Sequence, residues 1–256
     1  AKKVKNLLQK KQINLKIISN KKKIEKNIQG EARKIRYDLL SNFCLKNNIR
    51  SLITAHNLED QVETFLIRLS RGSGLRGLSA MRPKSKINSK IDLYRPLLDT
   101  KKEFLIKISK KTFGNFIKDP SNKNLKYLRT KVRSLKKPLE KSGVEYEQIF
   151  KSIRNLSDSR DSLDDFLKKE FSKIIKKKGN EILINLKKFK NHNNEIKMAI
   201  INASIKKLKK NYYDPRAKKV ANLIKTIEKK GYKKSTLGGC IFFKKGINLC
   251  LKNEKL

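Results

Sequence analysis

The sequence predicts an α/β protein in which part of a doubly wound parallel sheet is followed by a smaller helical α+β domain. In the first half, short apolar runs alternate with segments whose apolar residues recur every three or four positions, as strands alternate with the helices that cover them. In the second half, a long helical pattern comes first and a glycine-flanked hairpin comes last. Ser142 and Gly143 form a plausible boundary, so we expect one domain at 1–140 and another at 141–256.

The first domain opens with a helical pattern, and the mostly apolar residues 15–18 then predict a short buried strand. A second helix is expected around 32–43, and residues 52–55 predict another strand. A third helix follows Asn57, with one apolar face made of Val62, Phe65, Leu66 and Leu69. A doubly wound fold normally begins with a strand and a phosphate-binding turn, so we expect these parts to lie upstream of Ala1.

Beyond residue 100 the elements become more basic. We expect a helix near 101–111, a turn at 119–122 and a basic helix that ends near Pro138. The elements predicted for the second domain are a helix at 146–178, a strand at 182–186, helices at 195–209 and 216–230, and a hairpin at 240–251.

The charge of the chain points to a polyanionic partner. Lys and Arg number 66 against 23 acidic residues, a formal net charge of +43. Nucleic acid is the first partner to consider, although Lys and Asn richness also arises in AT-rich genomes. We expect no membrane, because the longest apolar runs fall far short of the roughly 20 residues that span a bilayer. Cys44, Cys240 and Cys250 show no metal-binding spacing and suggest reduced thiols in the cytoplasm.

The stretch 55–77 carries the most chemical information. His56 stands where a strand gives way to a helix, and ligands of open α/β sheets bind at the carboxyl ends of strands. Asn57 can cap the helix together with Asp60, and this capping role is the plain alternative for Asp60. Asp60 and Glu63 are three residues apart and share one helix face, where paired carboxylates can hold a metal or an ammonium.

Arginine is scarce in this Lys-rich chain, which makes its positions informative. A guanidinium binds phosphate at two points, whereas an ammonium is a point charge. Arg68 and Arg71 follow on the same helix, ahead of a loop that begins at Gly72. For each arginine, a surface ion pair is the alternative.

The sequence resembles the tRNA(Ile)-lysidine synthetase family of the N-type ATP-pyrophosphatases in several segments. They are AHNLEDQVETFLIRLSRGSGLRGLSAM at 55–81, EARKIRY at 31–37, RPLL at 95–98, KDPSN at 118–122, YYDPR at 212–216 and TLGGC at 236–240. The family's Ser-Gly-Gly-x-Asp-Ser loop is not in this chain, Phe116 replaces a common Trp, and the basic helix departs slightly from Arg-Asn-Arg. We therefore expect the chain to be either a fragment of an enzyme or a degenerate enzyme, and to be inactive alone.

The resemblance implies an ATP-pyrophosphatase fold and a ligase reaction. ATP adenylates the C2 oxygen of the wobble cytidine of tRNA(Ile), and L-lysine then displaces AMP to form lysidine, so that AUA is read. His56, Asp60 and Glu63 would be catalytic. Arg33 and Arg36 would join His56 and Asp60 around the nucleotide, with magnesium at Asp60.

For the other substrates, the resemblance implies that Glu63 binds the ammonium of lysine or removes its proton, while Arg68 and Arg71 hold lysine's carboxylate or tRNA. Arg129, Lys131 and Arg133 would contact tRNA from the basic helix. We expect the carboxylate face and this basic helix to be distant from each other.

Two other functions stay open. A tRNA thiolase of the same group would commonly need a CxxC pair, which the chain does not have. A non-catalytic RNA-binding protein would explain the charge but not the acidic pair beside His56. A homodimer is also left open.

Overall fold

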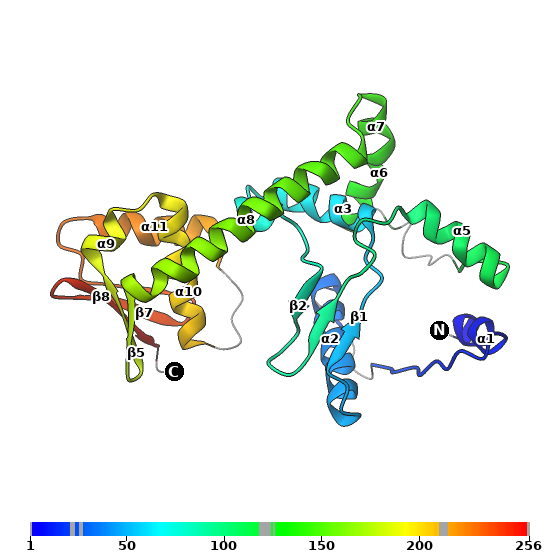
Figure 1. The fold of residues 1–256 in the computed structure, drawn as a ribbon, viewed down its shortest axis with the longest axis horizontal. Coiled ribbons are helices and arrows are strands. Elements are labelled where there is room, and N and C mark those ends of the chain that lie inside the picture. The colour runs from blue at the N-terminus through cyan, green and yellow to red at the C-terminus, as the bar shows by residue number, and fades with distance from the viewer. Residues whose placement is uncertain are drawn as a thin grey trace. The chain divides into compact units, whose positions relative to one another are not determined.

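The computed structural model describes residues 2–20, 24–25, 28–117, 124, 126–209 and 215–254, without the side chains of residues 2, 29 and 172. The chain divides into two compact units (Figure 1). The N-terminal unit contains residues 1–71 and 78–154, and the C-terminal unit contains residues 72–77 and 155–256. The functional division at residue 140 stays a prediction. The turn expected at 119–122, the KDPSN segment and residues 212–214 of the YYDPR segment lie outside the described residues.

The first eleven elements begin in the N-terminal unit, except α4, which begins among residues 72–77 of the C-terminal unit. In chain order they are α1 Lys2–Gln9, α2 Ile28–Lys46, β1 Ser51–Ile53, α3 Leu58–Leu69, α4 Leu75–Leu78, β2 Lys84–Lys86, β3 Asp92–Tyr94, α5 Lys102–Phe113, α6 Leu128–Ser134, α7 Lys136–Lys141 and α8 Tyr146–Ile174. The helices expected at 32–43, after Asn57 and near 101–111 are thus confirmed as α2, α3 and α5.

A small mixed sheet organises this unit, with strand order β1-β3-β2. β1 and β3 are parallel, with Leu52 opposite Leu93, and β2 pairs with β3 in the antiparallel direction. The connection from β1 to β3 includes α3, as expected of a crossover between parallel strands. The α/β class with a partly parallel sheet is therefore confirmed.

The strand predicted at 15–18 is wrong. Residues 13–20 are neither helix nor strand, and Ile17 and Ile18 are exposed. A strand is defined by a hydrogen-bonded neighbour, which a local apolar run cannot supply.

The basic helix also ends earlier than predicted. α6 stops at Ser134, and Pro138 belongs to the first turn of the next helix, α7. Proline is tolerated there because the amides of a first turn have no intrahelical acceptor.

Tyr146 begins α8, whose residues up to Arg154 belong to the N-terminal unit. Its apolar residues pack with those of α3 in a second cluster of buried side chains, made of Leu58, Val62, Ala80, Tyr146, Ile149 and Ile153. α3 is therefore held by apolar contacts along one side, which leaves its acidic side for the site described below.

The C-terminal unit is an antiparallel sheet with helices. Its elements are β4 Ile175–Lys178, β5 Glu181–Asn185, α9 Leu186–Lys190, α10 Asn194–Leu208, α11 Ala217–Glu228, β6 Lys234–Leu237, β7 Cys240–Lys245 and β8 Asn248–Asn253. The strand order is β4-β5-β8-β7-β6. The long helix predicted to reach residue 178 ends at Ile174 instead, because the next four residues pair with β5 as β4.

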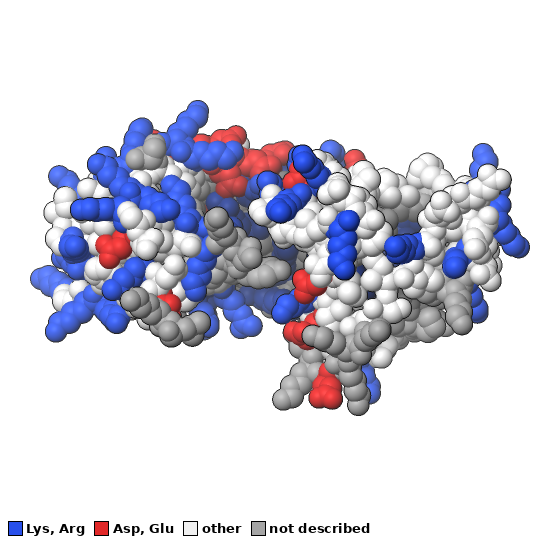
Figure 2. Space-filling model, turned by 90° about the horizontal axis from the view of Figure 1, so that it is seen from below, with Lys and Arg blue, Asp and Glu red and all other residues white. Residues whose placement is uncertain are grey.

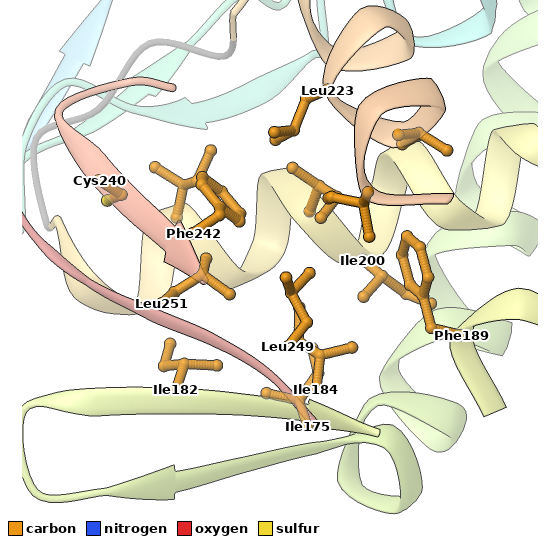
Figure 3. Packing of buried hydrophobic residues seen from close by; sticks show 14 of the residues in the cluster. Ile175, Ile182, Ile184, Phe189, Ile200, Leu223, Cys240, Phe242, Leu249 and Leu251 are labelled. Carbon is orange, nitrogen blue, oxygen red and sulfur yellow. The ribbon is translucent and has the colours of Figure 1, made fainter. Parts of the chain in front are cut away.

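Aliphatic and aromatic side chains from this sheet and from α9, α10 and α11 form one core (Figure 3). Phe189, Ile200, Phe242 and Leu249 are completely buried in it. The predicted hairpin is confirmed as β7 and β8. None of the described helices is long and apolar enough to cross a membrane.

Candidate active site

The amino end of α3 is fixed by a reciprocal cap. The Asn57 side chain accepts a hydrogen bond from the Asp60 amide at 3.0 Å, and the Asp60 carboxylate accepts one from the Asn57 amide at 3.1 Å. This confirms the predicted capping box. Because α3 starts a few residues after β1, the cap orients Asp60 at the carboxyl end of the parallel strands.

His56 lies between β1 and the cap. Its Nδ1 shares a hydrogen bond of 2.9 Å with the Thr54 hydroxyl. Burial lowers the pKa of His56 below its ordinary value of 6.5, and the positive charges of Arg95, Arg33 and Arg129 lower it further against the opposing effect of Asp60. The imidazole is therefore neutral near pH 7, which makes it a hydrogen-bond acceptor or a base.

Glu63 lies one turn further along α3 and is 1% exposed. Arg133 donates to it through Nε at 2.6 Å and through Nη2 at 3.0 Å, and Arg129 donates through Nε at 2.7 Å. Arg129 also donates to Asp60 at 2.7 Å through Nη2. These four side chains form what we call the α3–α6 ion cluster. Such a buried carboxylate is tolerated only because it is paired and hydrogen-bonded.

The prediction that the carboxylate face and the basic helix are distant from each other is therefore wrong. α6 presents Arg129 and Arg133 on one face, four residues apart, and that face meets Asp60 and Glu63. Local spacing groups residues on one helix but does not reveal which helix faces them. Lys131, by contrast, is exposed on α6.

The two arginines at the end of α3 differ in their surroundings. Arg68 donates to the Ala80 carbonyl at 2.8 Å. Together with Gln61, which exchanges two hydrogen bonds with Met81, it holds residues 80–81 against α3. Arg71 is exposed. Arg68 thus has a structural contact, whereas Arg71 faces solvent.

The arginines expected on α2 lie at its surface. Arg33 and Arg36 are both exposed. The Arg33 guanidinium stacks over the Tyr37 ring at 5.0 Å and is close enough to His56 to affect its pKa. Arg33 is therefore near enough to His56 to act on its charge, whereas Arg36 has no such effect or ring contact among the described residues.

Arg95 begins the RPLL segment but was not among the site residues predicted from the sequence. It follows β3, is 8% exposed, and donates to the Arg82 carbonyl at 2.8 Å and to the Ser85 hydroxyl at 3.0 Å. Its Nε has no hydrogen-bond partner among the described residues, and burial lowers its pKa. Arg95 follows β3, which is parallel to β1, so it lies at the same edge of the sheet as His56. This position is the signal that could have identified Arg95 as a site residue.

In this arrangement the carboxylates predicted to hold magnesium are occupied by arginines. Asp60 already accepts from Arg129 and from the Asn57 amide, and both oxygens of Glu63 accept from arginines. Within the described residues no group of three or more potential metal ligands occurs. A divalent cation at Asp60 would have to displace Arg129.

Comparisons with known proteins show the family to which the chain belongs. A family profile described as the PP-loop domain matches residues 1–139. The chain belongs to the PP-loop domain family. A tRNA(Ile)-lysidine synthase from Wolbachia pipientis is 35% identical over 91% of the chain and 54% of its own length. Another so named, from Zymomonas mobilis, is 39% identical over 61% of the chain and 49% of its own length.

This PP-loop chain spans about half the length of the curated relatives that it matches. The comparison with solved structures found a U34-tRNA thiolase from Methanococcus maripaludis with its [4Fe-4S] cluster. The match covers 58% of this chain and 53% of the thiolase chain, with a TM-score of 0.46 and 17% sequence identity. That overlap is too weak to carry an argument.

Proposed function

We propose that this chain contributes to a tRNA(Ile)-lysidine synthase, a ligase that uses ATP and L-lysine to convert the wobble cytidine of tRNA(Ile) to lysidine. The observation that carries the proposal is the match of 91% of the chain, at 35% identity, to a relative of that name. The α3–α6 ion cluster beside a neutral His56 supports it, because a purely structural RNA-binding protein needs no such arrangement at a strand end.

The proposed chemistry has two steps. The C2 oxygen of cytidine attacks the α-phosphorus of ATP, and pyrophosphate leaves. The amine of lysine then attacks C2, AMP leaves with the oxygen, and the amine loses a proton. An unperturbed lysine has a pKa of about 10.4, so a nearby base must remove that proton.

We assign His56 to the nucleotide side and to proton removal, because its lowered pKa keeps it unprotonated. Arg33, with Arg95 at the adjoining strand end, would bind phosphate, and Arg36 would contribute from α2. The finer fold, a doubly wound ATP-pyrophosphatase sheet, belongs to this proposal too.

Glu63 and Asp60 are proposed to receive the ammonium of lysine. Since Arg129 already donates to both carboxylates, the arriving ammonium would replace it. Arg129 would then turn to an anionic group of tRNA or the adenylate, while Arg133 continues to hold Glu63. Arg71 and Lys131, both exposed, are proposed contacts to the tRNA backbone, and Arg68 supports Arg71.

The thiolase alternative is less well supported. Cys44, Cys240 and Cys250 are all buried. Burial raises the pKa of Cys240 and Cys250 above the ordinary value, which keeps them as unreactive thiols.

The test uses a chimaera in which this chain replaces the matching segment of the Wolbachia pipientis relative. We expect ATP-dependent incorporation of labelled lysine into tRNA(Ile), found at the wobble nucleotide by nuclease digestion and mass spectrometry. The 256-residue chain alone should not exchange pyrophosphate with ATP, since it contains no Ser-Gly-Gly-x-Asp-Ser loop. A folded chimaera that exchanges pyrophosphate but transfers no lysine would refute the proposal.

A further inference from the structure

A cavity of about 260 Å³ lies in the N-terminal unit, lined by residues of α3, α5, α6, α7 and α8. This volume is below the roughly 300–1,000 Å³ of pockets that hold drug-sized ligands. It therefore suits a molecule smaller than a nucleotide. Glu63, which belongs to the α3–α6 ion cluster, forms part of its wall.

Tyr146, at the start of α8, lines this cavity and is 2% exposed. Its buried hydroxyl has no hydrogen-bond partner among the described residues. Burial, assisted by the charge of Glu63, raises the pKa of Tyr146 to about 12, so the hydroxyl remains a donor. Buried polar groups in native proteins are nearly always satisfied, and an unsatisfied one at a cavity wall indicates a missing partner.

The charged groups of the cavity are balanced. Three carboxylates, of Glu59, Glu63 and Glu103, share the lining with three cations, of Lys102, Arg133 and Lys136. In a chain of net charge +43, such a balanced site does not select a polyanion. It matches a ligand that carries both an ammonium and a carboxylate.

The placement of these groups supports a zwitterion. Glu59 accepts from the Lys102 amide at 2.8 Å and faces the Lys136 ammonium at 3.6 Å. That ammonium lies 5.1 Å from the centre of the Tyr146 ring. A carboxylate and an aromatic face thus already lie against one cation. They adjoin a hydroxyl donor that has no acceptor within the described residues.

We propose that this cavity binds the head group of a free α-amino acid, with the carboxylate accepting from Tyr146 and the ammonium near Glu59 and Glu103. The identification of this amino acid as L-lysine rests on the proposed function. Its side-chain amine then lies on the side of the cavity where Glu63 forms the wall. Tyr146 is thereby a substrate-binding residue.

Calorimetric titration of the 256-residue chain with L-lysine tests this inference. Tyr146→Phe removes only the hydroxyl and should weaken lysine binding about tenfold or more, as expected for a hydrogen bond to a charged group. Tyr232→Phe is the matched control, because the Tyr232 hydroxyl donates to the Phe242 carbonyl in the C-terminal unit. It should bind lysine as the wild type does.

Pentane-1,5-diamine, which has lysine's amines but no carboxylate, separates the two ends of the ligand. Its affinity should be the same for the wild type and for Tyr146→Phe. Equal lysine affinity in both proteins, or no lysine binding by the folded wild type, would overturn the inference. If the chimaera is active and Tyr146→Phe leaves its KM for lysine unchanged, the inference is overturned but the proposed function is not. A chimaera that transfers no lysine would refute the function while the binding result stands.

Discussion

At the scale of single residues, His56 is controlled by charges from several elements. Burial and three arginines favour its neutral form, and Asp60 alone among the named charges opposes them. The unfolded chain takes up this proton near the ordinary value of 6.5, whereas the folded chain resists it. His56 therefore makes the fold less stable as the pH falls through that value.

Two single substitutions should move the pKa of His56 in opposite directions. Arg33→Ala removes a positive charge and should raise it, whereas Asp60→Asn removes the opposing negative charge and should lower it. An NMR titration of the imidazole protons measures both shifts, with His56→Gln to assign the resonance. If both variants shift the pKa in the same direction, the electrostatic account of this site is wrong.

The cap of α3 is also a single-residue device. Asn57→Ala should cost about 1 kcal/mol of unfolding free energy, typical of a lost N-cap. Asn193, which caps α10 by accepting from the Ile196 amide at 3.0 Å, offers the matched control, Asn193→Ala. Both should lower stability in denaturant titrations, but only Asn57→Ala should change the pKa of His56, because only that cap orients Asp60. An unchanged His56 titration in Asn57→Ala would contradict this.

At the scale of elements, the α3–α6 ion cluster ties a helix of the active site to a basic helix. Arg129 and Arg133 donate hydrogen bonds to Glu63 although they lie 66 and 70 residues from it in the sequence. A substitution on either helix therefore affects the other. Variants of Glu63 and Arg133 should each alter the use of both lysine and tRNA, not of one substrate alone.

A double-mutant cycle measures this coupling. Glu63→Gln should lower the free energy of unfolding by about 2–4 kcal/mol. Breaking a fully buried ion pair would cost more, but here the arginines are about a third exposed. Adding Arg133→Gln should cost less than the sum of the single effects, with a coupling of about 1–2 kcal/mol. The exposed pair of Lys101 and Glu147 supplies the control Glu147→Gln, which should cost under about 0.5 kcal/mol. Additive effects at Glu63 and Arg133 would show that the cluster does not couple the helices.

At the scale of the whole molecule, the dominant property is charge. The net value of +43 implies long-range attraction to any polyanion. In the C-terminal unit, Lys and Arg side chains cover much of the face seen in Figure 2. RNA binding should therefore depend mainly on contacts with the phosphate backbone.

Binding of tRNA should fall steeply with salt. With 6–10 phosphate contacts, affinity drops by about 10³-fold or more between roughly 50 and 200 mM salt. Fluorescence anisotropy with labelled tRNA(Ile) measures the slope. Lys131→Gln, at an exposed position of α6, should reduce that slope by about one. The charge-preserving Lys131→Arg is its control, and an affinity insensitive to salt would exclude backbone contacts as the main source of binding.

The features that the sequence determined are the local ones. The spacing of apolar residues was enough to predict α2, α3, α10 and α11, and the three-residue spacing of Asn57 and Asp60 was enough to predict the cap. Both are local because helices and caps are made of hydrogen bonds between near neighbours. The family resemblance likewise rests on short contiguous segments. Tertiary structure decided the rest: it left residues 13–20 without a strand, and placed the arginines of α6 on Glu63. It also buried the Tyr146 hydroxyl, which has no partner in the described part of the chain. Each of these depends on which distant element packs against the residue, and periodicity along one segment does not contain that information.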